Sequence, residues 1–382
     1  MFTKGYMKIN KLLLTFVSSL TICIIFFTSN AIGGIKSKIS NKVLDLQKSP
    51  QTYSFIVAGH TYGSPGPSMY PAASLLGSID LFNSLKPDFM MLLGDVIQHQ
   101  GYPPILGELE TEVFKDSLVN KLEFPVFNAP GNHDLRDRKS YKKHFGETYF
   151  HFQKSSELYI VLDTDLDPSS MIKPQVDFAL NLIELAAEDK KIKNIFVFQH
   201  RVIWAFDNYP INTINPWGND INSVSNNYEK FILPALNLLA KKKNVYLLSG
   251  DLGIGSFVPN KYPRESFDIF YQKYNNITYV ATGLAENHKD KVIKVDVSSS
   301  GEVDFKLIPL FGSKIENIEK YGLDYWKNEF KDLVEPSAAS KAKEKVKKFL
   351  LMNFSLFVLG SILLILLAFV YILFLRHQLT KK

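Results

Sequence analysis

Long runs of consecutive apolar, β-branched and aromatic residues place the strongest constraint on how this chain of 382 residues can fold. Nine such runs recur between residues 53 and 310, among them YSFIVAGH, DFMMLLGD, NIFVFQH and NVYLLSGD. A strand exposed on one face alternates apolar and polar residues, whereas a continuous apolar run is typical of a strand covered on both faces. The sequence therefore predicts an α/β fold with buried sheets.

Segments of helical character separate these runs and can cover the sheets. The expected helices span Ala72 to Leu85, Leu106 to Leu118, Val176 to Glu188 and Tyr228 to Lys241. Strands that alternate with such helices indicate a layered α/β architecture.

Polar residues with metal-binding or catalytic chemistry follow five of the predicted strands, each at the carboxyl end. These residues are His60, Asp95, Asn132, His200 and Asp251. Open α/β sheets bind their ligands at this edge, where the carboxyl ends of several strands meet. Each residue taken alone also fits a turn or a cap. Their joint occurrence on five strands favours a binding site, whereas Asp163 and Asp165, which also end a strand, are interpreted as turn caps.

The motifs Gly94-Asp95 and Gly131-Asn132-His133-Asp134, followed by a lone His200 at a strand end, occur in the order found in the calcineurin-like metallophosphoesterases. The chain resembles that family over about residues 53–310. The resemblance implies a four-layered α/β/β/α sandwich. It also implies two metal ions at the strand ends and hydrolysis of phosphate esters by a metal-bound hydroxide.

Two motifs depart from the family pattern. The usual Asp-x-His reads Ala58-Gly59-His60, and the usual Gly-His-x-His reads Gly250-Asp251-Leu252-Gly253. The first metal set implied by the resemblance is therefore Asp95, Asn132, His200 and Asp251. The second retains only His60 and Asp95, so one site is well formed and the other is doubtful.

The donor atoms of the first metal set indicate which divalent ions are favoured. Two carboxylates, one amide and one imidazole suit Mn²⁺, Mg²⁺ or Fe²⁺ somewhat better than a nitrogen-rich set would, and Zn²⁺ remains open. A divalent metal of one of these kinds is the expected cofactor.

The resemblance also assigns roles in catalysis. His133 corresponds to the general acid at the leaving oxygen, and Asp134 is expected to orient it. Asn132 and Arg201 are the expected substrate-binding residues, because amide and guanidinium groups pair with phosphate oxygens. Arg136 and Arg138 are further candidates for such contacts.

The two ends of the chain predict a tether to a membrane. Residues 1–31 contain lysines, an uncharged run and small residues, typical of a signal peptide or signal anchor. Residues 349–375 carry no charge and are long enough to span a bilayer as a helix. We expect a metallophosphoesterase-like domain over 50–312, a charged stalk over 313–348 and a cytoplasmic tail over 376–382. The main domain is then extracytoplasmic, on a single-pass chain or a two-pass chain if the signal is uncleaved.

Charge limits the classes of partner. The formal net charge of +6 comes largely from lysines near the ends, and mixed charges between them indicate no nucleic-acid-binding surface. The favoured hypothesis is a membrane-anchored phosphoesterase acting on a phosphorylated small molecule, glycan or lipid. The alternatives are a weakly active or inactive relative that serves as a binding or assembly subunit, and a purely structural role for the strand-end residues.

Overall fold

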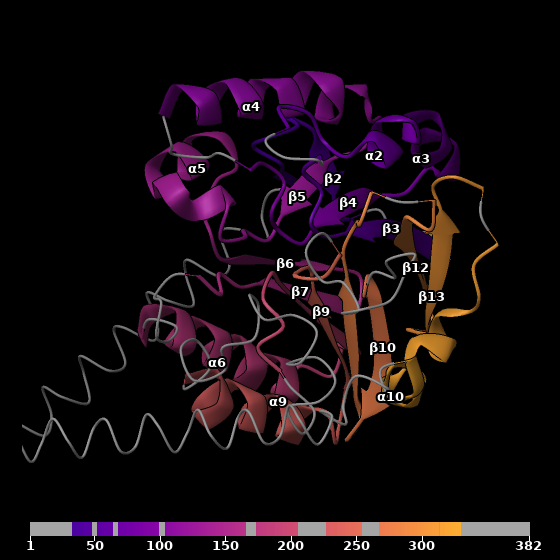
Figure 1. The fold of residues 1–382 in the computed structure, drawn as a ribbon. Coiled ribbons are helices and arrows are strands. Elements are labelled where there is room, and N and C mark those ends of the chain that lie inside the picture. The colour runs from indigo at the N-terminus through magenta and orange to yellow at the C-terminus, as the bar shows by residue number, and fades with distance from the viewer. Residues whose placement is uncertain are drawn as a thin grey trace, which may run out of the picture. The chain divides into compact units, whose positions relative to one another are not determined.

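The fold is taken from a computed structural model, which describes residues 33–47, 52–63, 68–98, 104–165, 173–204, 227–253, 267–286, 288–312 and 314–329 (Figure 1). The predicted signal segment 1–31, transmembrane helix 349–375 and tail 376–382 lie outside these residues, as does the stalk beyond residue 329. Within the described part of the chain, no helix combines the length and apolar character needed to cross a membrane.

Two mixed sheets form the centre of the protein. The five-stranded sheet has the order β13-β12-β3-β4-β5, in which β3, β4 and β5 are parallel and β12 and β13 are antiparallel to their neighbours. Its strands are β3 (Thr52–Ala58), β4 (Phe89–Leu92), β5 (Val126–Asn128), β12 (Lys291–Ser298) and β13 (Val303–Pro309).

The six-stranded sheet has the order β10-β11-β9-β8-β7-β6, with four parallel inner strands and an antiparallel strand at each edge. Its strands are β6 (Phe150–Lys154), β7 (Glu157–Val161), β8 (Asn194–Gln199), β9 (Asn244–Ser249), β10 (Ile269–Tyr274) and β11 (Ile277–Thr282). A separate hairpin pairs β1 (Gly34–Lys36) with β2 (Val43–Asp45).

Aromatic side chains pack the two sheets against each other. Phe55 on β3 stacks on Phe89 of the neighbouring strand, with ring centroids 4.8 Å apart. It also meets two rings of the other sheet edge-on, Tyr159 at 5.7 Å and Phe196 at 5.3 Å. Offset and edge-to-face aromatic contacts of this kind add to the stabilisation that burial provides.

Helices cover the outer face of each sheet, with α2 to α5 on one side and α6 and α9 on the other (Figure 1). The helices are α2 (Ala73–Leu76), α3 (Ile79–Leu85), α4 (Pro104–Ser117), α5 (Arg138–His144), α6 (Lys173–Glu188), α9 (Leu233–Leu239) and α10 (Leu323–Glu329). Short turns of other helix types are η1 (Val119–Lys121), η2 (Asp134–Asp137), η3 (Tyr228–Ile232) and η4 (Ile318–Tyr321). The described chain is thus a mixed α/β sandwich, as the sequence predicted.

All nine predicted strands are present, whereas the short hairpin strands β1 and β2 and the edge strands β6 and β10 were not predicted. The edge strands β6 and β10 have mixed burial, because one edge or face meets solvent. They therefore lack the continuous apolar run by which the inner strands were recognised. The predicted helix over 72–85 is likewise interrupted, since Gly77 and Ser78 separate α2 from α3.

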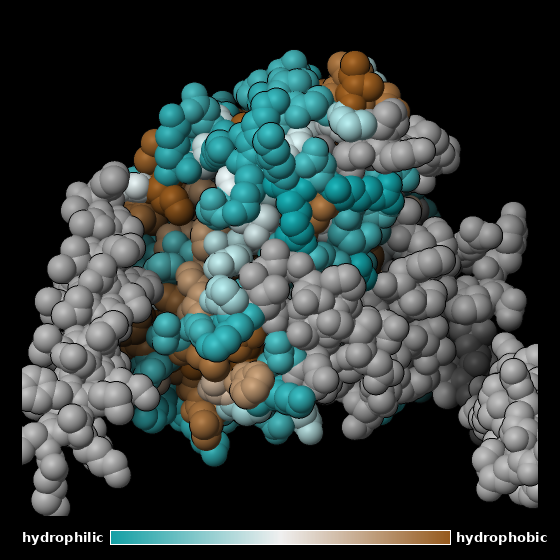
Figure 2. All heavy atoms as spheres, turned by 90° about the vertical axis from the view of Figure 1, so that its left-hand side faces the viewer, coloured by the Kyte–Doolittle hydropathy of each residue, from teal (hydrophilic) through white to brown (hydrophobic). Residues whose placement is uncertain are grey.

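The surface is mixed in character. Figure 2 shows one face on which hydrophilic side chains predominate in the upper part and hydrophobic ones lie between them lower down. Large exposed hydrophobic side chains on the layer of α6, η3 and α9 are Leu185, Phe231 and Leu238. Single exposed apolar residues of this kind are usual on soluble domains.

The described structure extends beyond the predicted domain limits of 50–312. On the N-terminal side, the buried ammonium of Lys154 donates to the Asp45 carbonyl oxygen of β2 at 2.8 Å. On the C-terminal side, Trp326 of α10 donates from its indole nitrogen to the Ile269 carbonyl oxygen at 3.0 Å and packs on Phe267. The first part of the predicted stalk is therefore packed onto the sheet, with Trp326 buried against β10.

Replacing Trp326 by alanine tests whether α10 is part of the folded domain. Trp326 is 3% exposed, so we expect Trp326→Ala to lower the free energy of unfolding by about 3–5 kcal/mol. Urea unfolding measures this change, and the exposed neighbour Lys327→Ala is the control. Equal urea midpoints for Trp326→Ala and the unsubstituted protein would show that α10 belongs to the stalk and not to the folded domain.

Candidate functional site

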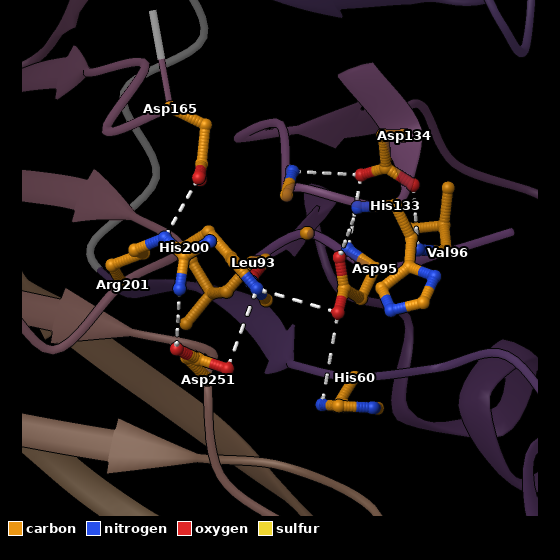
Figure 3. A network of polar contacts seen from close by, with 12 residues as sticks. His60, Leu93, Asp95, Val96, His133, Asp134, Asp165, His200, Arg201 and Asp251 are labelled. Carbon is orange, nitrogen blue, oxygen red and sulfur yellow. Dashed lines mark hydrogen bonds and ion pairs between the residues drawn. The ribbon is translucent and has the colours of Figure 1, made fainter. Parts of the chain in front are cut away.

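The structure brings four of the predicted site residues together where strands of both sheets end (Figure 3). His60 follows β3 and Asp95 follows β4 of the five-stranded sheet, whereas His200 follows β8 and Asp251 follows β9 of the six-stranded sheet. The site thus lies across the junction of the two sheets, at the edge predicted from the sequence.

Glycines allow the strand ends to approach this closely. A Cβ atom on Gly250 would stand 1.9 Å from the Leu93 carbonyl oxygen, and one on Gly94 would stand 2.6 Å from Nδ1 of His200. Gly94 also has a positive φ of +83°. The glycine before each aspartate is therefore required by the contact between the two sheets.

Two candidate ligands have an unusual backbone. The φ angles of His60 and Asp95 are +51° and +54°, in the left-handed region. This conformation costs a residue with a Cβ roughly 1–2 kcal/mol, so surrounding contacts must hold it in place. Such residues concentrate at functional sites.

Asp95 has one carboxylate oxygen fixed and one directed at the histidines. Its Oδ1 accepts the backbone N–H of His133 at 3.0 Å. Its Oδ2 lies 3.4 Å from Nε2 of His200 and 4.0 Å from Nδ1 of His60. A carboxylate held in this way presents its second oxygen to any cation bound between the two rings.

The tautomer of His200 follows from its surroundings. Nδ1 lies 2.7 Å from the Leu93 carbonyl oxygen, which can only accept, so Nδ1 carries the proton. Nε2 is buried without a hydrogen-bond partner among the described residues and lies 3.6 Å from Oδ1 of Asp251. A carbonyl that fixes one ring nitrogen and leaves the other facing carboxylates is typical of a metal-binding histidine.

Burial and charge act differently on the two histidines. Burial disfavours the protonated ring and lowers the pKa of His60 to about 4. At His200 burial also opposes protonation, but the carboxylates of Asp95 and Asp251 outweigh it and raise its pKa to about 10. Burial raises the pKa of Asp251 to about 6. The negative charges of this site therefore attract positive charge to the position of Nε2 of His200.

Asp134 has a different task from the expected one of orienting His133. One of its oxygens accepts the N–H groups of Asp95 and Gly131, at 3.0 and 2.9 Å. The other accepts those of Val96 and Ile97, at 2.9 and 3.3 Å. This fully buried carboxylate therefore fastens the loop after β4 to the loop after β5.

His133 is oriented instead by backbone and an aromatic ring. Its Nδ1 lies 3.0 Å from the Gln98 carbonyl oxygen. Tyr62 lies between the two histidine rings of this sheet, with centroids 5.2 Å from His133 and 4.7 Å from His60. Sequence reasoning missed Tyr62, whose only signal was its place two residues after His60.

The predicted substrate-binding residues occupy different settings. Arg201 directs Nε to Oδ1 of Asp165 at 2.7 Å, and one terminal nitrogen lies 3.7 Å from Oδ2 of Asp251. Asn132 is half-buried on the turn before His133, and none of the described hydrogen bonds involves its amide. Arg201 thus lies beside the site with carboxylate partners already in place.

The other arginines and strand-end aspartates are separate from the site centre. Arg138 pairs with the buried Asp163 at 2.5 Å, whereas Arg136 is exposed. Asp163 accepts the N–H of Asp165 at 3.0 Å, which confirms its role as a turn cap. Asp165 itself holds Arg201, a contact that the sequence did not indicate.

The donors fit a divalent cation in chemical type but do not surround one point. Within the described residues, no three His, Cys, Asp or Glu side chains are arranged as a complete metal-binding group. Both ring nitrogens of His60 are nevertheless buried without hydrogen bonds, and Nε2 of His200 is also buried without one. Buried imidazole nitrogens beside the carboxylates of Asp95 and Asp251 are the ligands that Mn²⁺, Fe²⁺ and Zn²⁺ accept.

The positions of the absent family ligands have different surroundings. Ala58 is 1% exposed and belongs to the apolar core under α2 to α4. Gly253 has a φ of +96°, and a Cβ atom there would stand 2.2 Å from the Leu284 carbonyl oxygen. A histidine cannot occupy position 253 without moving the backbone, so the loss of that ligand is built into the fold.

Comparison with known proteins identifies the family to which this site corresponds. Residues 72–326 match the sequence model of the calcineurin-like phosphoesterases. No curated protein matches the chain.

Solved structures that resemble the chain do so at low identity. A purple acid phosphatase from yellow lupin (Lupinus luteus) seeds shares 12% identity with a TM-score of 0.47, over 72% of this chain and 55% of that one. A dimetal phosphatase from Danio rerio shares 12% identity with a TM-score of 0.48, over 69% of this chain and 97% of that one. The phosphopantetheinyl hydrolase of Mycobacterium tuberculosis shares 10% identity with a TM-score of 0.30, over 62% and 92%.

Replacing Asp134 by asparagine tests its role as the fastener of the two loops. We expect Asp134→Asn to lower the free energy of unfolding by about 1–3 kcal/mol, because an amide NH₂ would face buried N–H groups. Urea unfolding measures the loss, with the exposed Asp116→Asn as control. Unchanged stability would show that the loops are held by other contacts.

Proposed function

Because the chain belongs to the calcineurin-like phosphoesterase family, we propose that it is a metal-dependent phosphoesterase with one carboxylate-rich metal site. The observation that carries this proposal is the meeting of three side chains from both sheets. Oδ2 of Asp95 faces Nε2 of His200 and the ring of His60, and these nitrogens are buried without hydrogen bonds. Packing alone does not explain why these imidazole nitrogens are buried without hydrogen-bond partners.

Asp95, His200 and Asp251 would hold the cation, with Asn132 as the fourth donor and His60 alongside. A divalent ion bound there supplies electrostatic stabilisation of the phosphoryl oxygens and a lowered pKa for an attacking water. With two carboxylates in the set, Mn²⁺, Mg²⁺ or Fe²⁺ is the favoured ion and Zn²⁺ is the alternative.

The remaining residues position these donors and move a proton. Asp134 holds the loops that carry Asp95 and His133, and the Leu93 carbonyl fixes the tautomer of His200. His133, oriented by the Gln98 carbonyl and flanked by Tyr62, is the proposed general acid for the leaving oxygen. Arg201, held beside the site by Asp165, is the proposed partner of phosphate oxygens.

Location and substrate are part of the proposal. The uncharged segments near both ends support a membrane-anchored protein with its main domain outside the cytoplasm. The substrate would then be a phosphorylated small molecule, glycan or lipid on that side.

A second candidate function is a weakly active or inactive binding subunit with the same fold. Two observations favour it: Ala58 lies in the core, and the backbone at Gly253 excludes a histidine. Both remove donors from a second metal. A protein that uses one metal for shape alone would have the same ligands, so hydrolysis must be measured together with metal content.

Replacement of the metal donors separates the two functions. We expect Asp95→Asn and Asp251→Asn to lose bound metal and to hydrolyse p-nitrophenyl phosphate and bis(p-nitrophenyl) phosphate at least about 100-fold more slowly. Elemental analysis and release of p-nitrophenol are the measurements, with Asp116→Asn as the charge-matched control. Bound metal without hydrolysis in the unsubstituted protein would favour the binding subunit.

The role of His133 can be tested with leaving groups of different basicity. We expect His133→Gln to keep its metal and to lose roughly 10²–10⁴-fold in kcat with an alkyl phosphate, whose leaving oxygen needs a proton. The loss with p-nitrophenyl phosphate should be much smaller, because p-nitrophenolate leaves unprotonated. An equal decrease in kcat with both substrates would show that His133 is not the general acid.

A further inference from the structure

A basic pocket lies at the end of the sheet opposite the candidate metal site. Its volume is ≈ 270 Å³, and it is formed by the turn from α9 into β9 and by the hairpin of β10 and β11. The lining residues that matter for its chemistry are Lys241, Lys242, Lys243, Asn244, Lys273 and Thr278.

Four lysines are among the residues that line this pocket, and no acidic residue is. Lys243 is held by two carbonyl oxygens, of Asp189 at 2.7 Å and Ile192 at 2.6 Å. Lys241, Lys242 and Lys273 are exposed, and within the described residues no ion pair neutralises them. Lysines that line one pocket repel one another, so an anion bound among them is stabilised.

The walls of the pocket are fixed by secondary structure. Lys273 lies opposite Thr278 in the β10–β11 pair, and Thr278 lies opposite Tyr246 in the β11–β9 pair. Cross-strand neighbours of this kind share one face of the sheet. On the other wall, the side-chain amide of Asn244 donates to Oδ1 of Asn194 on β8 at 2.9 Å. The strands therefore hold the position of Lys273, whereas Lys241 to Lys243 extend from the turn that leads into β9.

The pocket is separate from the candidate metal site. Asn244 begins β9 and Asp251 follows its far end, seven residues later. A strand rises about 3.3 Å per residue, so the two places are roughly 20 Å apart. A ligand in the pocket therefore need not displace one from the metal site.

We propose that this pocket binds a phosphate group, as a second anion site independent of hydrolysis. Several ammonium groups with neighbouring amide and hydroxyl groups match the oxygens of a phosphate. The group can belong to free phosphate or to an anionic phospholipid. Exposed apolar side chains of the adjoining elements, Leu238 on α9 and Tyr274 on β10, would contact the rest of a lipid but not free phosphate.

The rate at which each lysine is acetylated reports binding at this place alone. The full chain, in neutral detergent with a chelator to prevent turnover, is treated with an acetylating reagent and analysed by peptide mass spectrometry. The probes are inorganic phosphate, dihexanoyl phosphatidic acid and, as the zwitterionic control, dihexanoyl phosphatidylcholine. At ten times Kd, we expect acetylation of Lys242 and Lys273 to slow about tenfold, because only the free site reacts. Lys121 and Lys139, exposed elsewhere, should react unchanged.

The outcomes distinguish the sources of the phosphate group. Protection by both anionic probes supports a site for the phosphate group itself, whereas protection by phosphatidic acid alone assigns it to a lipid headgroup and protection by phosphate alone to a soluble ligand. Protection by phosphatidylcholine to the same extent, or no protection by either anion, would overturn the proposal. The variant Lys242→Glu/Lys273→Glu should lose anion binding in calorimetry, while Lys121→Glu/Lys139→Glu, with the same change in charge, should keep it.

Discussion

The buried carboxylate of Asp134 is the contact on which the geometry of the site depends. It accepts backbone N–H groups from the loop after β4 and from the loop after β5, and so joins two strand ends that carry Asp95 and His133. Asp95 is thereby kept in a left-handed backbone conformation, which is unfavourable for a residue with a Cβ. With one oxygen of Asp95 bound to the N–H of His133, the other is left facing the histidines.

A surplus of buried negative charge explains the electrostatics around this arrangement. Asp95 and Asp251 face each other across His200, and Arg201 with Asp165 closes one side. In the absence of another cation, the lowest-energy response is a proton on His200, which is why its pKa is raised although burial opposes this. A divalent ion would neutralise the same carboxylates with more charge than a proton carries. The neutral ring of His60 lies beside them as a further donor.

The departures from the family pattern are accommodated by the fold in two different ways. At Ala58 the position belongs to the apolar core, where a carboxylate would be costly without a partner. At Gly253 the backbone itself passes too close to Leu284 for any side chain. At position 253 a side chain therefore requires a shift of the backbone, whereas at position 58 the obstacle is the apolar surroundings.

The inner strands, the edge of the candidate site and the meeting there of His60, Asp95, His200 and Asp251 could be predicted from the sequence, because a buried strand needs a continuous apolar run and its end is marked by Gly-Asp or a polar residue. Tertiary structure alone decided the rest. The place of Tyr62 beside His133, the contacts of Asp134 with the loop after β4 and the packing of Trp326 on β10 join residues far apart in the chain. The edge strands β6 and β10 form local hairpins with their neighbours, but they lack the continuous apolar run that marks a buried strand. Local sequence patterns do not show which strand ends and helices the fold brings side by side.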